Sequence, residues 1–133
     1  MAVLLLAIAM GTSASAGRTN VTVQGQGTCG ETACNLELSA DGNAELLSGR
    51  GELSDSHGED IEFSFTGTCA NGCSVVSLQG SVIDSDLPNF VGIGSGISIT
   101  AEASTGAITV TVSGETGATA TYTLTGTVTT TSG

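Results

Sequence analysis

The residues best suited to chemistry lie in one polar segment, residues 54–60, between two stretches of alternating apolar residues. It contains His57, the only histidine of the chain, and the three carboxylates of Asp55, Glu59 and Asp60. Carboxylate oxygens are hard ligands of the kind that Ca²⁺ prefers, so these three residues form a weak candidate calcium site. Their spacing fits no EF-hand loop, and we favour the simpler interpretation of a solvated turn between strands.

The chain carries little of the machinery that enzymes use. Catalytic triads and histidine-rich metal centres need more than one histidine, or a histidine beside an activated nucleophile, and this chain has one histidine and no lysine. Paired carboxylates serve glycosidases, but tryptophan, the usual platform for sugars, is absent. We therefore expect a protein without enzymatic activity and without a cofactor, and rank a hydrolase third among the possible functions.

The cysteines form two closely spaced pairs. Four residues separate Cys29 from Cys34, three separate Cys69 from Cys73, and both pairs begin with Gly-Thr-Cys. An even number of cysteines in an exported protein predicts disulfide bonds. Of the possible pairings we favour the two local ones, because each spans a turn rich in Gly or Asn. A four-cysteine zinc site is the alternative, although its spacings depart from the usual C-x2-C.

The N-terminal segment predicts export. Residues 2–10 are apolar without interruption, and Ala14-Ser15-Ala16 follows as a small-x-small cleavage site. The apolar run is shorter than the about 20 residues that span a membrane. We expect residues 1–16 to be a signal peptide and residues 17–133 to form a single domain without a membrane span, secreted to the extracellular space or the cell surface. A retained apolar tail that mediates assembly is the alternative.

Charge narrows the choice of partners. Thirteen Asp and Glu residues oppose two Arg residues, which gives a net charge of −11. Such a surface repels phosphate backbones, so we expect no binding to nucleic acid.

Apolar and polar residues alternate with a period of two along most of the chain. The clearest case runs from Thr119 to Thr129, where every odd position is threonine. About eight short strands, separated by turns rich in Gly, Asn and Asp, predict an all-β protein. We expect an antiparallel β-sandwich of the jelly-roll or immunoglobulin-like type. A change of face at Leu46-Leu47 predicts a β-bulge.

Several strands carry glycine where alternation predicts an inward-facing residue. The simpler interpretation is strand curvature. The alternative is a groove in a thinly filled core, because glycine within a strand also permits another backbone or a ligand to approach closely. The candidate residues of this groove are Gly67, Gly80, Gly126, Phe63, Phe65 and Tyr122.

In composition, residues 17–133 resemble the neocarzinostatin-type apoproteins. Those proteins are exported, acidic sandwiches rich in Gly, Ala, Thr and Val, with two short-range disulfides and a chromophore in a cleft; their cysteine spacings differ from those of this chain. The composition is similar also to that of extracellular filament subunits, in which an extended segment of one subunit completes the core of the next.

The leading functional hypothesis is a secreted structural subunit. It would self-associate into an extracellular filament, a pilus or a surface layer as a homo-oligomer or polymer, and exchange either the strand around Val21 and Val23 or the C-terminal strand. The alternative is a monomeric binding module, a closed eight-stranded domain whose groove accepts a small apolar molecule or a glycan.

Overall fold

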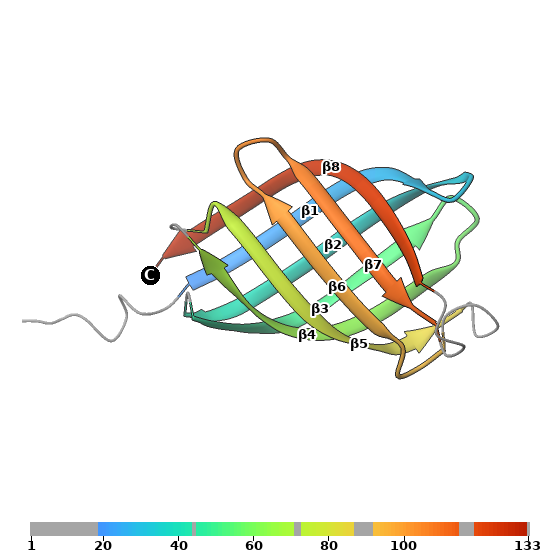
Figure 1. Cartoon of the computed structure of the whole chain (residues 1–133), viewed down its shortest axis with the longest axis horizontal. Helices are drawn as coiled ribbons and strands as arrows, with labels where there is room; N and C mark the ends of the chain where they lie inside the picture. Colours follow the sequence, from blue (N-terminus) through green and yellow to red (C-terminus); the bar gives the residue numbers. More distant parts are fainter. Residues whose placement is uncertain (1–18, 44, 71–72, 87–91, 115–118, 133) are drawn as a thin grey trace, which may run out of the picture.

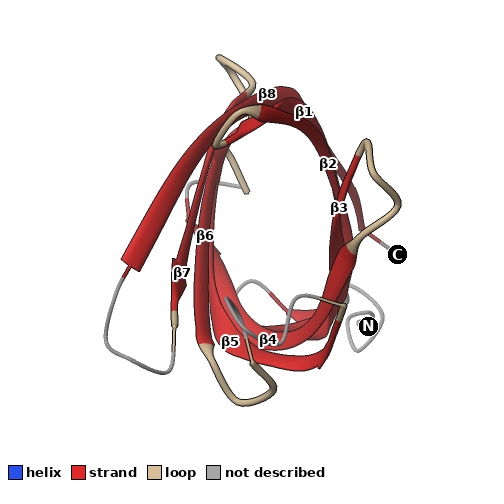
Figure 2. Cartoon of the chain, turned by 90° about the vertical axis from the view of Figure 1, so that its right-hand side faces the viewer, coloured by secondary structure: helices blue, strands red, loops and turns tan. Residues whose placement is uncertain are grey.

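Every described strand pairs with a neighbour on each side, so the sheet closes on itself (Figure 1 and Figure 2). The computed structural model describes residues 19–132 except 44, 71–72, 87–91 and 115–118, and the predicted signal peptide lies outside the described residues. The strands are β1 (Thr19–Cys29), β2 (Thr32–Asn43), β3 (Leu46–Asp55), β4 (Asp60–Ala70), β5 (Val75–Ser85), β6 (Gly96–Glu102), β7 (Ala107–Ser113) and β8 (Thr119–Ser132).

The predicted sandwich is wrong, because the eight strands form one closed barrel. Each strand is antiparallel to the next in sequence, and β8 returns to pair with β1, from Thr19 opposite Ser132 to Gly27 opposite Leu124. Jelly-roll and immunoglobulin-like folds need connections that cross between two sheets. Here every connection joins neighbouring strands of one sheet. The sandwich implied by the resemblance to the neocarzinostatin-type apoproteins is contradicted by the same finding.

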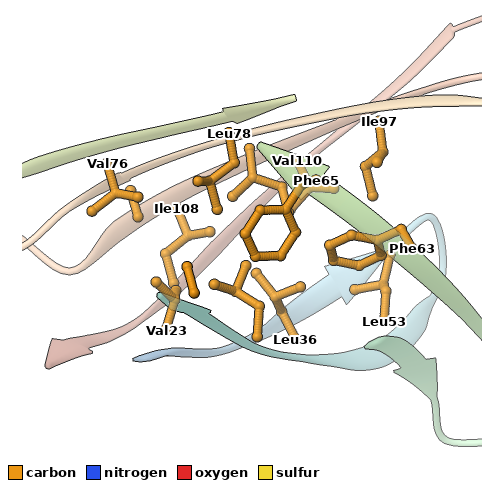
Figure 3. Packing of buried hydrophobic residues seen from close by; sticks show 14 of the residues in the cluster. Val23, Leu36, Leu53, Phe63, Phe65, Val76, Leu78, Ile97, Ile108 and Val110 are labelled. Atoms are coloured by element: carbon orange, nitrogen blue, oxygen red, sulfur yellow. The ribbon is translucent and has the colours of Figure 1, made fainter. Parts of the chain in front are cut away.

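Alternation places the apolar side chains inside the barrel (Figure 3). Phe63 and Phe65 project inward from β4 with their ring centroids 6.0 Å apart. The largest side chains that are almost wholly buried are those of Phe63, Leu36, Leu47, Leu78, Ile99, Ile108 and Leu124. Leucine, isoleucine and valine from all the strands therefore fill an interior that holds few aromatic rings.

Glycines lie where neighbouring strands approach each other most closely. A Cβ atom at Gly80 would overlap the carbonyl oxygen of Ser64 on β4, and one at Gly126 would overlap that of Gln24 on β1. Only glycine permits such an approach within a strand. The structure thus supports strand curvature as the reason for these glycines.

The β-bulge predicted at Leu46-Leu47 is also wrong. β3 pairs with β2 and β4 without a shift in register. Leu46 points outward and is 60% exposed, whereas Leu47 is fully buried, so the two residues simply lie on opposite faces of β3. The irregularity of the barrel lies instead between β4 and β5, at Glu62 and Phe63.

The strand ends divide between the two ends of the barrel. The strand ends that flank the β1–β2, β3–β4, β5–β6 and β7–β8 connections lie at one end, which we call the mouth end, and the remaining strand ends lie at the other. The β1–β2 turn is a two-residue hairpin turn in which Gly30 has φ 68°, the left-handed conformation that such turns require.

Candidate functional site

A cavity of about 130 Å³ lies at the mouth end of the barrel, the end that faces the viewer in Figure 2. A single water needs only about 10–15 Å³, and an apolar cavity of about 150 Å³ accepts benzene. The cavity therefore has room for one six-membered ring or a short alkyl group.

The inner wall of the cavity is apolar. Leu53, Ile61 and Val112 project into it from β3, β4 and β7, and all three are buried. Leu53 and Ile61 lie opposite each other in the β3–β4 pairing. The disulfide between Cys29 and Cys34 adds a further apolar wall on the side of β1 and β2. An apolar group placed here would exchange water for carbon and sulfur contacts.

The rim of the cavity is polar and carries two carboxylates, those of Asp55 and Glu59. Oδ1 of Asp55 accepts hydrogen bonds from the backbone N–H of His57 (2.9 Å) and of Glu59 (3.0 Å). The N–H of Asp55 in turn donates to the carbonyl oxygen of Glu59 at 2.9 Å, and the N–H of Ser56 donates to Ala33 on β2 at 3.0 Å. These bonds hold the β3–β4 turn and the carboxylate of Asp55 in a defined position.

Thr32, Ser54 and Tyr122 complete the rim with hydroxyl groups. Tyr122 is half-buried, and burial raises the pKa of its phenol above the usual value of 10.0. The phenol is therefore neutral at physiological pH and available as a hydrogen-bond donor.

The structure separates the residues predicted to line a groove. Tyr122 lines the mouth cavity, but Phe63 and Phe65 fill the core and are 0% and 4% exposed. The space beside Gly80 and Gly126 is taken by the backbone of the adjacent strand, and the same holds for Gly67, which meets Ser77 on β5. The mouth cavity is formed by residues at strand ends, whereas Phe65 and Gly80 border a separate, shallow hollow beside Ser64 and Gln79.

Val21 and Val23, the candidates for strand exchange, are fully buried in β1. β1 pairs with β2 along its whole length and with β8 from Thr19 to Gly27. Exchange of β1 or β8 between subunits would require the closed sheet to open.

The predicted calcium residues fall into two clusters. Asp55 and Glu59 lie with His57, and Asp60 lies with Glu52 and Glu62; within each cluster the possible ligand atoms are within 4.8 Å of one another. The first cluster belongs to the rim of the mouth cavity, and the second lies on the outer face of β3 and β4.

The second cluster belongs to a longer row of carboxylates. Glu37, Glu52, Glu62 and Asp84 lie opposite one another in register across β2, β3, β4 and β5. The pKa of Glu52 is raised, first by burial and then by Asp60, Glu62 and Glu37. This row is not evident in the sequence, since its members come together only once the register of the strands is known.

Both disulfides join neighbouring cysteines, Cys29 to Cys34 and Cys69 to Cys73, and none of the described cysteines is free. The first disulfide lies at the mouth end and the second near the β4–β5 connection at the opposite end. Two disulfides are compatible with an extracellular or otherwise oxidising location. Within the described ranges, no helix has the length and apolar character needed to cross a membrane.

Comparison with known proteins gives no relative for this barrel: the chain matches no protein family, no curated protein and no solved structure.

Proposed function

We propose that this protein is an exported binding module whose mouth cavity holds a small apolar group of a ligand. The observation that carries the proposal is the cavity of about 130 Å³, in which an apolar wall lies beneath a polar rim. Ligand sites in proteins typically combine such walls with a few convergent polar groups that fix orientation. The predicted signal peptide and the two disulfides support export.

The size of the cavity defines which part of a ligand it accepts. Sites for drug-sized ligands have volumes of about 300–1,000 Å³, so a cavity of about 130 Å³ accommodates one ring or a short alkyl chain rather than a whole large ligand. The apolar wall of Leu53, Ile61 and Val112 favours a hydrocarbon ring over a sugar, whose hydroxyl groups would lose their hydrogen bonds to water.

The site is also held in place before a ligand arrives. The Cys29–Cys34 disulfide fixes the β1–β2 hairpin on one side, and the hydrogen-bonded turn around Asp55 fixes the other. Preorganisation of this kind lowers the entropic cost of binding.

The closed barrel favours the binding module over the self-associating subunit. Strand addition needs a free edge, and the described strands all have partners on both sides. The filament hypothesis therefore stays a prediction from the sequence.

The proposal is tested by filling the cavity. Val112→Phe places a ring in the cavity from β7, and Thr111→Phe adds the same ring one residue away, on the outer face of the same strand. Benzyl alcohol, a neutral probe of suitable size, is titrated into ¹⁵N-labelled protein, and the backbone amide shifts of Ser54, Val112 and Tyr122 are followed by NMR. Circular dichroism shows whether each variant folds, and Ile61→Phe provides a second filled cavity.

We expect the wild-type protein and Thr111→Phe to show saturable shifts at these amides, and Val112→Phe and Ile61→Phe to show none. Absence of any shift at the mouth in the wild-type protein, or binding that survives in both filled variants, would overturn the proposal. Light scattering on the same samples reports any self-association.

A further inference from the structure

We infer that the ligand of the mouth cavity carries a positively charged amino group, which Asp55 and Glu59 hold at the rim while the apolar part of the ligand fills the cavity. The inference rests on the proposed function and adds the chemical class of the ligand, a small alkyl- or arylalkylammonium ion.

Two carboxylates lie at the edge of the cavity. Asp55 and Glu59 both line the cavity, and their carboxylate oxygens lie within 4.8 Å of each other. The two backbone hydrogen bonds to Asp55 go to Oδ1, so we assign Oδ2 to the ligand. An ammonium group carries three donors and can bond to both carboxylates at once.

No Arg or Lys among the described residues lies at this site, and His57 is the only basic side chain grouped with Asp55 and Glu59. Arg50 is the only Arg or Lys among the described residues, and it lies on the outer face of β3, beside Glu52 and Glu62. The chain as a whole carries a net charge of −11. Two close carboxylates repel each other, and a cation between them relieves this repulsion.

Tyr122 lines the same cavity from β8. The face of an aromatic ring attracts a cation within about 6 Å of its centroid. Carboxylates, an aromatic ring and an apolar wall within one small cavity are together suited to an organic cation, since an inorganic ion would gain nothing from the apolar wall.

The test uses three probes that share one ring: benzylamine, which is cationic at pH 7, neutral benzyl alcohol and anionic benzoate. Each is titrated into the full mature protein with EDTA present, so that no divalent ion competes for Asp55, His57 and Glu59. Affinity is followed by the amide shifts of Ser54, Val112 and Tyr122. In a separate sample without a probe and without EDTA, calcium chloride tests whether the carboxylates bind an inorganic cation.

The variant Asp55→Asn/Glu59→Gln removes both charges but keeps the side-chain shapes, and the amide introduced at position 55 retains the Oδ1 acceptor of the turn. The matched control Glu45→Gln/Glu102→Gln removes the same charge at the opposite end of the barrel, where the amide introduced at position 102 retains the acceptor oxygen for Thr105.

We expect benzylamine to bind about five- to tenfold more tightly than benzyl alcohol, in the range of charge-assisted hydrogen bonds at a partly exposed site, and benzoate to bind least. The preference disappears in Asp55→Asn/Glu59→Gln and persists in the control. Equal binding of the three probes would overturn the charge inference but leave the proposed function standing. Binding of none of them would overturn both, and a response at these amides to calcium alone would assign the carboxylates to an inorganic ion.

Discussion

Phe63 on β4 lies opposite Gly51 on β3, and its ring fills the space that a side chain at position 51 would need. A Cβ atom at Gly51 would come within 2.5 Å of Cζ of Phe63 and 2.8 Å of Cβ of Leu38. A missing side chain on one strand is thus matched by a large one on its neighbour. This pairing helps a barrel whose described strands hold only two Phe and one Tyr to fill its interior.

The pairing predicts that substitutions at the two positions depend on each other. We expect Gly51→Ala to destabilise the wild-type protein by about 1–3 kcal/mol, the usual cost of extra carbon in a packed core. In a Phe63→Leu background the cost is smaller, because the shorter side chain leaves room for the new methyl group. Urea unfolding of the four proteins of this double-mutant cycle measures the coupling, expected at about 0.5–3 kcal/mol. Ile99→Val, on β6, is the control, and equal coupling with both partners would contradict the contact.

The sequence predicted the strands because their signal is local. Ile108, Val110 and Val112 alternate with polar residues, and all three are buried in β7. The two disulfides were predicted for the same reason, since each joins cysteines on either side of one turn. Within the described residues, the prediction of an all-β fold with about eight strands is confirmed.

Closure of the barrel could not be predicted in this way. It depends on the pairing of β1 with β8, whose residues lie at opposite ends of the chain, and no local pattern records which strands are neighbours. One signal was present: Gly25 and Gly126 lie opposite each other in that pairing, where two backbones approach closely. The alternation marks Gly126 as an inward-facing glycine, but the sequence does not reveal that it faces Gly25.

The candidate site was predicted only in part, for the same reason. Tyr122, Asp55 and Glu59 were singled out, but for a groove and a calcium site rather than for one cavity. Leu53, Ile61 and Val112 look like ordinary core residues in the sequence. They line a cavity only because they are inward residues close to the mouth end, and that end is defined by the closed barrel.

Gly126 lies where β8 pairs with β1 to close the barrel, and we expect its substitution to destabilise the protein. Gly126→Ala places a methyl group against the carbonyl oxygen of Gln24 on β1, which cannot move without breaking the β1–β8 pairing. We expect a loss of at least about 1–3 kcal/mol in the free energy of unfolding. Gly96→Ala on β6 is the matched control, since its nearest contact would be 3.9 Å away. Thermal unfolding compares the two variants, and a similar melting temperature for both would contradict the close approach of β8 to β1 at Gly126.

We expect the two disulfides to contribute alike to stability but differently to binding. Cys29→Ala/Cys34→Ala and Cys69→Ala/Cys73→Ala each open a short loop, so each should lower the free energy of unfolding by about 2 kcal/mol. Only the first pair lines the mouth cavity. We therefore expect weaker binding of benzyl alcohol in the first variant and unchanged binding in the second, measured well below both melting temperatures. Equal losses of affinity would show that the Cys29–Cys34 wall is not specific to the site.

The row of carboxylates on the outer face predicts a stabilising substitution. Glu52 has Glu37 opposite it on β2 and Glu62 opposite it on β4, and Asp60 lies close by. Like charges that face each other across strands are destabilising. Glu52→Gln should therefore raise the melting temperature at pH 7, whereas Glu45→Gln, which removes the same charge from the β2–β3 connection, should raise it less.

The gain from Glu52→Gln should depend on pH in a defined direction. Burial, followed by Asp60, Glu62 and Glu37, raises the pKa of Glu52 above its ordinary value of 4.5. The folded protein therefore binds the proton of the Glu52 carboxyl more tightly than the unfolded chain does. The wild-type protein loses stability as the pH rises from 4.5 through the pKa of Glu52 in the folded state. Above the pKa of Glu52 in the folded state, Glu52→Gln is more stable than the wild-type protein by the full amount. As the pH falls below 4.5, Glu52 is protonated in both the folded and the unfolded state, and this gain in stability disappears. Melting temperatures of the wild-type protein and the two variants, measured from pH 3 to pH 8, test this, and an advantage that persists at the acid end would mean that the charge of Glu52 is not its source.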